Sequence, residues 1–544
     1  MKLQRLFLKK DIQNLIEESE GGNKLKRTLT TTHLVALGLG AIIGTGIFVI
    51  TGQAAAEYAG PALTISFVIS AIACIFAGLC YAELAAMIPV SGSVYSYSYA
   101  TIGEFIAWFI GWDLILEYTV VSITVSIGWS GYFVMLLKTI GIHLPAFLCQ
   151  PPFNLPAAII VLIITTILVI GIRESSRFNN VMVVIKLAVI LFFILFGALF
   201  LRPENWSPFM PFGLTGVMTG AAMVFFAYIG FDAISTTAEE AKNPQRDLPI
   251  GIIASLATCT LLYIAVAIVL TGIVPVETVA NNQHFLHAPV AYALSYINQG
   301  WASGVISIGA IMGITSVLLV MMMGQPRVFF AMSRDKLLPK KISTVHKKFK
   351  TPYITTIMTG VIVAIIAMMI PIGTAAELAN IGTLFAFAIV CAAVLILRRR
   401  KPDVKRVFKV PIIYLIAPLG VLTSVGLMCS LPILTWIRFL IWLDIGLIIY
   451  YFYSRKHSRL AEKHNFIANT SLKHFLNFFA TIITCNGLIL GILSIFAKLG
   501  LTSVKGWEEI SFTPDGFLIL CGFLTVLGIG LYLISKFLKD GTGK

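Results

Sequence analysis

Among the charged side chains that stand inside otherwise apolar stretches of the chain, where ionisable groups are rare, four are of particular interest. Lys186 interrupts RFNNVMVVIKLAVILFF, and Asp232 lies in the middle of MTGAAMVFFAYIGFDAISTTAEE. Asp113 and Glu117 lie one helical turn apart in GWDLILEY and would share one face of a helix. An ionisable group at bilayer depth costs about 2.5–3.5 kcal/mol on insertion scales, so each of these residues is a candidate functional group.

Structural explanations compete with functional ones for these residues. Lys186 would lie about 9 Å from the cytoplasmic end of its stretch, from where a lysine can snorkel to water. Glu117 would lie about 20 Å along its helix, where it either bonds a neighbouring helix or forms a wall of a pocket. Asp232 is expected to cap the half-helix that follows a break. Glu83, in YAELAAMIPVSG, is expected in an interior polar network or gate.

Glycine is concentrated in two apolar stretches where a continuous helix would otherwise be expected. HLVALGLGAIIGTGIFVITG, residues 33–52, carries four glycines across its middle, and Gly230 directly precedes Phe231 and Asp232 in the other stretch. Glycine costs about 1 kcal/mol inside a helix, so such a cluster indicates either a break or a small-residue packing face. Two interruptions at corresponding positions of two halves are typical of an inverted repeat with a binding site at mid-membrane. We therefore predict two broken helices.

A broken helix exposes backbone groups that can bind both poles of a zwitterion. N–H groups at the start of a half-helix suit a carboxylate, and carbonyls at the end of the other half suit an ammonium group. The segment Gly44-Thr45-Gly46 is the predicted carboxylate site, while ammonium acceptors are expected at carbonyls beside both breaks. The predicted solute-binding residues are Ile42, Ile43, Gly44, Thr45, Gly46, Glu117, Phe226, Ala227, Ile229 and Phe231. This reasoning indicates a small amphoteric solute and leaves an amino acid and a betaine equally possible.

The elements that must position these residues are transmembrane helices. Of the 544 residues 58% are hydrophobic and only 12% charged, and the mean hydropathy is +0.91. These values exclude an intrinsically disordered, collagenous, coiled-coil or disulfide-rich protein and indicate an all-α polytopic membrane protein. The fourteen predicted spans are residues 33–55, 62–88, 104–137, 157–172, 179–201, 214–239, 249–273, 300–333, 353–370, 374–397, 410–430, 433–453, 472–497 and 515–538.

The net charge of +15 is explained by topology rather than by binding to nucleic acid. Nearly all of the 40 Lys and Arg residues fall in alternate connections, which places both termini in the cytoplasm. The predicted organisation is a cytoplasmic arm (1–32), a first repeat with spans 1–5 (33–201), a second, inverted repeat with spans 6–10 (214–397), spans 11–12 (410–453), a basic cytoplasmic linker (454–471), spans 13–14 (472–538) and a cytoplasmic tail (539–544).

Several long segments occur in a recognisable order between about Thr31 and Arg400. They are GAIIGTGIFVITG, YAELAAMIPVSGSVYSYSYATIGEFIAWFIGWDLILEY, PFGLTGVMTGAAMVFFAYIGFDAISTTAEEAKNPQRDLPIGI and MSRDKLLPKKISTVHKKFKTP. Together they resemble the amino acid–polyamine–organocation permeases, and within them the cationic amino acid transporter branch and its bacterial relatives. The resemblance implies the five-plus-five inverted-repeat fold of the leucine transporter with broken helices 1 and 6, here followed by four extra helices. It also implies alternating access and amino-acid substrates held by the backbone at the breaks.

The resemblance also implies roles for two of the charged residues. In proton-coupled relatives a lysine in the fifth span occupies the place that sodium fills elsewhere, so Lys186 is the expected proton-coupling residue. The cationic branch has an acid in the stretch that contains Glu117, which favours the pocket role for this residue. The expected function is proton-coupled uptake of a neutral or cationic L-amino acid across the plasma membrane. An amino acid exchanger and a non-transporting amino acid sensor remain alternatives.

Other classes of function lack support in the sequence. No HExxH, GxSxG or Walker sequence and no Cys/His cluster is present, so we expect no enzyme, no metal site and no cofactor. The expected partners are an amino acid, protons and membrane lipids, with no nucleic acid. Glu239 and Glu240 are expected to be solvated or paired with nearby bases, and Trp507 is expected at the membrane interface. The sequence assigns no role to spans 13–14.

Overall fold

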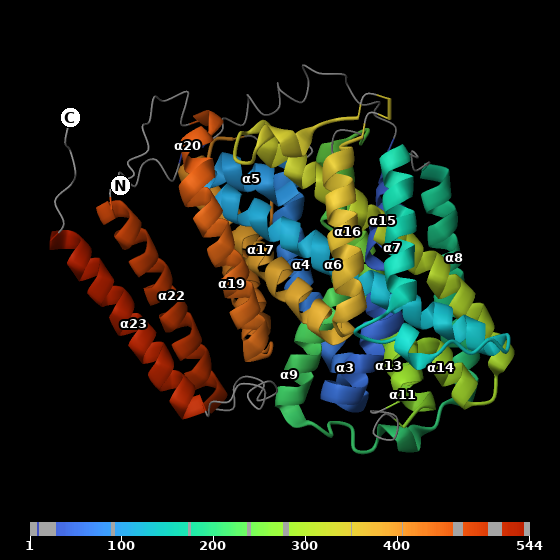
Figure 1. Ribbon diagram of the computed structural model, residues 1–544. Helices are drawn as coiled ribbons and strands as arrows, with labels where there is room; N and C mark the ends of the chain where they lie inside the picture. Colours follow the sequence, from blue (N-terminus) through green and yellow to red (C-terminus); the bar gives the residue numbers. More distant parts are fainter. Residues whose placement is uncertain are drawn as a thin grey trace.

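The structure is a computed structural model in which almost every described element is a helix (Figure 1). It describes residues 8–9, 29–88, 93–171, 176–236, 241–275, 282–346, 348–349, 351–404, 406–460, 472–498 and 514–537. The helices of the first half are α2 (Thr31–Ile42), α3 (Thr51–Ala54), α4 (Leu63–Met87), α5 (Ser93–Thr101), α6 (Glu104–Thr139), α7 (Leu155–Ile170) and α8 (Ser176–Gly197). The second half has α9 (Gly213–Val224), α10 (Ala233–Thr236), α11 (Pro244–Ile273), α13 (Gln283–His287), α14 (Pro289–Tyr296), α15 (Gly300–Arg334), α16 (Tyr353–Met369) and α17 (Ile372–Arg400). After it come α18 (Ile413–Cys429), α19 (Ile433–Ile449), α20 (Arg455–His457), α22 (Leu472–Lys498) and α23 (Pro514–Phe537).

The helices have the length and surface of membrane spans. Among the described residues ten helical segments are long and apolar enough to cross a bilayer, and four shorter apolar helices accompany them. Large apolar side chains point outward, such as Leu195 at 70% and Leu199 at 76% exposure. Such exposure would be unfavourable in water and is expected against lipid. The prediction of an all-α polytopic membrane protein is therefore confirmed.

The described part of every predicted apolar stretch is largely helical, but the boundaries differ in places. After the first predicted stretch is interrupted near its middle, helical structure runs from Gly46 to Met87 as one segment. The segment turns at Gly60, whose φ is +60°. An L-residue rarely adopts this φ, so glycine allows the chain to reverse without an intervening loop. This turn lies within residues 56–61, between the first two predicted spans.

Three short helices lie where the sequence analysis placed connections. Helix α5 lies between the second and third spans of the first half, and α13 and α14 lie between the second and third spans of the other half. They occupy opposite ends of the bundle in Figure 1. Their sequences are short and rich in Ser, Tyr, His and Pro, so they have no apolar period of the length of a span.

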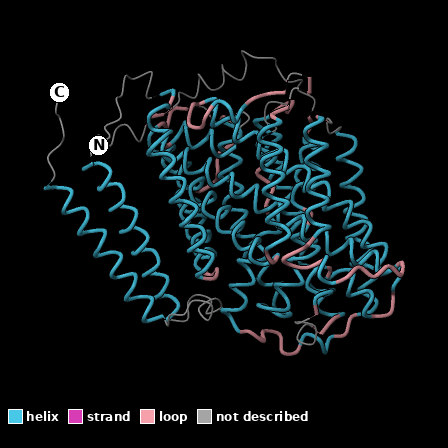
Figure 2. Tube along the Cα trace, in the orientation of Figure 1, coloured by secondary structure: helices cyan, strands magenta, loops and turns pink. Residues whose placement is uncertain are grey.

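Helix α6 lies at the centre of the bundle and packs along both α15 and α17. Helix α11 packs on α4 and α2, which brings the first span against the second half. Helices α22 and α23 pack on each other and reach the rest of the bundle through α19, so they form a hairpin at one edge (Figures 1 and 2). The centre of the bundle, and not this hairpin, contains the two breaks.

Candidate functional site

The first helix is interrupted where the glycine cluster predicts it. Helix α2 ends at Ile42, Ile43 is extended with φ −74° and ψ 106°, and helical structure resumes at Gly46 as a π-helical turn. A π-turn inside a span is frequently a functional feature, since its wider spacing leaves backbone groups without their usual partners. All residues of this break are buried, so its free backbone groups face the protein interior.

The second interruption lies in the sixth span. Helix α9 gives way to a 3₁₀ turn, Phe225–Tyr228, followed by an extended Ile229 and by Gly230 with φ +116°. A Cβ on Gly230 would lie 2.9 Å from the carbonyl oxygen of Ala41, so both its φ and this close approach require glycine. Helix α10 then begins at Ala233. Both predicted breaks are thus present.

The two breaks touch each other in the middle of the bundle. A Cβ placed on Gly46 would lie 2.3 Å from the Cα of Ala227, so the two backbones are in direct contact there. Tyr263 of α11 joins the breaks from the side: its hydroxyl lies 2.9 Å from the Ala227 carbonyl and 3.2 Å from the Ile42 carbonyl. The structure thereby brings together segments that lie about 180 residues apart in sequence.

Tyr263 is a site residue that the sequence analysis missed. It stands in SLATCTLLYIAVAIVL, far from the ends of its span, whereas membrane tyrosines are usually concentrated at the interfaces. This unusual position of a tyrosine was the sequence signal that could have identified it. Its hydroxyl bonds the carbonyls of Ile42 and Ala227, which lie beside the breaks where acceptors for a substrate ammonium group are predicted.

Lys186 points into the bundle and does not snorkel. Its side chain is fully buried, and its ammonium group donates to the Gly40 carbonyl in the last turn of α2 at 2.6 Å. Gly313 of α15 lies against its aliphatic stem, where a Cβ would approach Cγ to 3.0 Å. The lysine therefore links α8 to the inner half of the broken helix, two residues before that half ends.

Thr45 provides a buried hydroxyl at the first break. Its Oγ1 has no hydrogen-bond partner among the described residues, although the residue is only 1% exposed. Gly128 of α6 makes room for the side chain, because a Cβ there would lie 2.5 Å from Thr45 Cγ2. A buried hydroxyl without a partner is unfavourable, so this atom is suited to bind a polar ligand.

Two of the predicted acids meet beside the second break. Asp232 immediately precedes α10, and its carboxylate lies among the backbone amides from Gly230 to Ala233, which is the geometry of a helix cap. Glu117 of α6 is 5% exposed and has the Thr383 hydroxyl and Asp232 as neighbours. Glu117 is therefore positioned beside the site, while Asp232 has the geometry expected of a cap.

Aromatic side chains close the site next to the second break. Phe231 is fully buried, and its ring centroid lies 5.6 Å from that of Tyr81 and 5.0 Å from that of Phe387. Tyr81 and Phe387 also contact each other at 5.5 Å. The three rings come from α4, α17 and the break itself, so they join three elements that surround the site.

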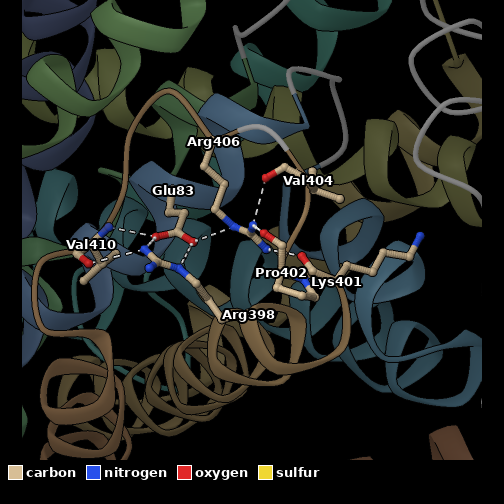
Figure 3. Close-up of polar contacts among 7 residues, drawn as sticks. All are labelled: Glu83, Arg398, Lys401, Pro402, Val404, Arg406 and Val410. Carbon is tan, nitrogen blue, oxygen red and sulfur yellow. Dashed lines mark hydrogen bonds and ion pairs between the residues drawn. The ribbon is translucent and has the colours of Figure 1, made fainter.

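Glu83 belongs to a separate ion-pair cluster at the end of α4 (Figure 3). Arg398 donates from Nε to Oε1 at 2.8 Å and from Nη2 to Oε2 at 2.6 Å, and the Val410 amide donates to Oε2 at 2.8 Å. Arg406 lies 3.4 Å from Oε1 and donates to backbone carbonyls of residues 401, 402 and 404. Glu83 thus joins the ends of α4 and α17 to the following loop, as expected of a polar network.

The remaining predicted groups carry less information. Glu239, Glu240 and Trp507 lie outside the described residues. Within the part of the chain that the structure describes, no group of three or more His, Cys, Asp and Glu side chains is arranged to hold a metal ion.

Two interrupted helices that meet at a buried site inside a membrane bundle define a permease for a small solute. The chain belongs to the amino acid permease family, whose sequence profile matches residues 29–435, well over half of its length. It is 51% identical over 466 residues to the branched-chain amino acid permease BcaP of Bacillus subtilis (strain 168). That match covers 84% of this chain and 99% of the relative.

Other relatives carry the names of different solutes. The chain is 50% identical to the methylthioribose transporter of Bacillus subtilis (strain 168), over 84% of this chain and 99% of that one. It is 39% identical to the vacuolar cationic amino acid transporter 2 of Arabidopsis thaliana, over 70% of this chain and 61% of that one. The resemblance to amino acid–polyamine–organocation permeases, with bacterial and cationic amino acid transporter relatives, is confirmed. The chain is therefore a multi-pass transporter and not an enzyme.

Proposed function

We propose that the protein is a secondary active transporter that takes up a neutral or cationic L-amino acid together with protons, by alternating access, across the plasma membrane. The observation that carries the proposal is the buried Lys186 ammonium bonded to the Gly40 carbonyl, together with the Thr45 hydroxyl at the same break, which has no partner among the described residues. Lys186 thus places an amine that can gain and lose a proton beside the backbone of the breaks, where a zwitterion can bind.

The substrate backbone would bind across both breaks. Its carboxylate would accept from the amides of Gly44–Gly46 and from the Thr45 hydroxyl, which has no competing partner among the described residues. Its ammonium group would donate to carbonyls such as that of Ala227, and would displace the Tyr263 hydroxyl from that oxygen. Binding would therefore exchange a neutral hydrogen bond for a charge-assisted one, which is roughly twice as strong.

Lys186 would couple this site to protons. When charged, its ammonium holds α2 against α8 through the Gly40 carbonyl; when neutral, the bond loses its charge assistance. Burial inside the bundle makes the charged form of the lysine costly, so the residue is suited to give up its proton. The ammonium group also repels a sodium ion at the same position, which favours protons as the coupling ion.

The side chain of the substrate would lie beside Glu117 and the aromatic rings of Phe231 and Tyr81. Glu117 favours a cationic side chain, and the rings favour an apolar one. The relatives show the same range, because one is named for branched-chain and another for cationic amino acids. Leucine and arginine are therefore the two substrates to test first, with alanine as the smallest neutral amino acid.

We also propose that the first ten spans form two inverted repeats (33–201 and 214–397) with spans 11–12 beside them (410–453). The hairpin of α22 and α23 would be an addition after the basic linker 454–471. The match to BcaP covers nearly all of that relative and leaves about a sixth of this chain unmatched, which is close to the length of residues 461–544. The Lys- and Arg-rich connections support cytoplasmic positions for both termini, including residues 1–32 and 539–544.

Uptake into sealed proteoliposomes tests the proposal. We expect labelled alanine, leucine or arginine to accumulate under an inward acid gradient in the wild type, and Lys186→Ala to abolish the dependence on the gradient. Lys186→Arg is the matched control for charge, since it keeps a cation that cannot lose its proton; it should retain exchange without accumulation. Flux that ignores both pH and the mutation would reject proton coupling. Flux that requires internal amino acid would indicate an exchanger, and binding without flux would indicate a sensor.

A further inference from the structure

We propose that Asp113 is a second proton site of the transporter, which carries a proton while the bundle is closed and releases it to water when the cytoplasmic side opens. This inference rests on the proposed proton-coupled transport and adds a residue to it. Asp113 lies on α6, one turn before Glu117, and the substrate site described above does not use it.

The surroundings of Asp113 are those of a neutral carboxylic acid. The residue is fully buried, and both carboxylate oxygens lack a hydrogen-bond partner among the described residues. Glu83, by contrast, accepts three hydrogen bonds from Arg398 and Val410. An ionised carboxylate that is buried without donors or a counter-charge is strongly unfavourable, so in this conformation Asp113 carries its proton.

The helices around Asp113 hold it in place without supplying a charge. On α17, Gly382 faces the carboxyl group so closely that a Cβ would lie 2.8 Å from Oδ1. On the neighbouring side, α6 is fixed to α19 by Trp112, whose indole nitrogen donates to the Trp442 carbonyl at 2.8 Å, and Trp442 donates back to the Trp112 carbonyl at 3.1 Å. The two indole rings stack at 4.5 Å.

The titratable groups nearest to Asp113 are acids and phenols. Glu117 faces it from the next turn of α6, and Asp232 and Tyr81 lie beyond Glu117. The part of α17 at this level contributes Gly382 and Thr383, and α19 contributes Trp442. None of these side chains is a base. On α15, which also packs along α6, Arg327 is exposed and interacts with Tyr118. We therefore infer that a proton neutralises Asp113.

Helix α17 contributes both to the Glu83–Arg398 ion pair and to the packing around Asp113. Gly382 and Arg398 both belong to α17, about 24 Å apart along the helix axis. Release of Arg398 from Glu83 would free the inner end of α17 and let water reach the carboxyl group. The O–H bond of Asp113 would then break and its proton would pass to water, because an aspartic acid in water is ionised at neutral pH. Closure would require the carboxylate to take up a proton again.

Asp113→Asn is the main test, because asparagine keeps the volume of the neutral acid and cannot release a proton. In proteoliposomes that hold a pH-sensitive dye, we expect the variant to bind and exchange the transported amino acid like the wild type. Accumulation under an inward acid gradient should fall at least tenfold, with fewer protons moved per substrate. Asp444→Asn is the matched control, since Asp444 is a membrane acid whose Oδ2 accepts from Asn486 at 2.7 Å; it should change neither quantity.

Carbodiimide labelling gives a measurement that does not depend on how well the asparagine variant folds. A carbodiimide adds to protonated carboxylic acids and leaves an N-acylurea, which mass spectrometry locates on a peptide. With a membrane-permeant carbodiimide we expect labelling of Asp113 in the wild type and less of it in Arg398→Ala, where α17 is released and the carboxyl group loses its proton to water. An Asp113→Asn variant that accumulates substrate with the wild-type pH dependence would overturn the proposal, as would an Asp113 that stays unlabelled in both proteins. Failure of the wild type to transport any amino acid would instead reject the proposed function.

Discussion

Charged and polar groups are buried in two regions of this bundle. The two regions differ in how far the hydrogen-bonding capacity of these groups is used. At the end of α4, Glu83 has every one of its acceptors used by Arg398, Arg406 and Val410 (Figure 3). At the breaks, the Thr45 hydroxyl has no partner among the described residues, and the Lys186 ammonium donates to a backbone carbonyl. A satisfied network fixes a structure, whereas an unsatisfied one leaves binding capacity for a ligand or a proton.

The difference follows from what each region has to do. The Glu83 cluster joins the ends of two helices to a loop, so its free energy depends on the closed arrangement of those ends. The breaks expose backbone N–H and C=O groups to the protein interior. These groups carry only partial charges, so leaving them without a charged partner costs less free energy than leaving an ionised side chain unpaired. Substitutions in the cluster should therefore act on stability, and substitutions at the breaks should act on substrate binding.

Glu83→Gln should have the largest effect on stability. Glutamine can still accept from the Val410 amide, but Arg398 and Arg406 lose their counter-charge, and Arg406 is only 8% exposed. Breaking a buried pair costs about 3–5 kcal/mol, and we expect about 1–3 kcal/mol here because Arg398 is 20% exposed. The apparent melting temperature in detergent should fall by several degrees while the KM for uptake changes less than about threefold.

Glu204→Gln is the matched control for this variant, because Glu204 is an exposed acid in the turn Pro203–Trp206. It should leave the melting temperature unchanged. A Glu83→Gln protein that melts like the wild type but loses substrate affinity would reverse the assignment of the two regions.

The sequence predicts the two breaks better than it predicts the side-chain contacts around them. The breaks are visible in the sequence because glycine acts on the backbone directly: Gly230 has a φ of +116° that other residues rarely adopt. The environment of Lys186 could not be decided from its depth in the span, since burial depends on α2 and Gly313 closing over it. The partner of Glu83 could not be identified either, because Arg398 lies 315 residues away in the chain.

Thr45→Val should have an intermediate effect, confined to substrate binding. Valine has the shape of threonine and removes a hydroxyl that has no partner among the described residues, so the melting temperature should stay equal or rise slightly. Loss of one hydrogen bond to the charged carboxylate costs about 1.5–3 kcal/mol, so the KM for uptake should rise at least about tenfold.

Thr51→Val provides the matched control. The Thr51 hydroxyl lies in the same helical segment but donates to the Gly46 carbonyl at 3.1 Å, so it is already satisfied within the helix. Its loss should leave the KM within about twofold of the wild-type value. Equal KM values for the wild type and Thr45→Val would remove Thr45 from the substrate site.

Tyr263→Phe should have the smallest effect, and its sign is the informative part. The Tyr263 hydroxyl occupies the carbonyls of Ala227 and Ile42, which the substrate ammonium group needs. A phenylalanine leaves both carbonyls open at the cost of one neutral hydrogen bond, about 0.5–1.5 kcal/mol, so substrate binds without displacing a competitor. We expect the KM to fall about two- to fivefold and the melting temperature without substrate to fall slightly. Tyr95→Phe is the matched control: Tyr95 is a buried tyrosine of α5 whose hydroxyl donates to Asp335 Oδ2 at 2.8 Å, away from both breaks, so its loss should lower stability without changing the KM. A higher KM in Tyr263→Phe would mean that the hydroxyl remains at the breaks and contacts the bound substrate, so that the ammonium group binds beside Tyr263 rather than in its place.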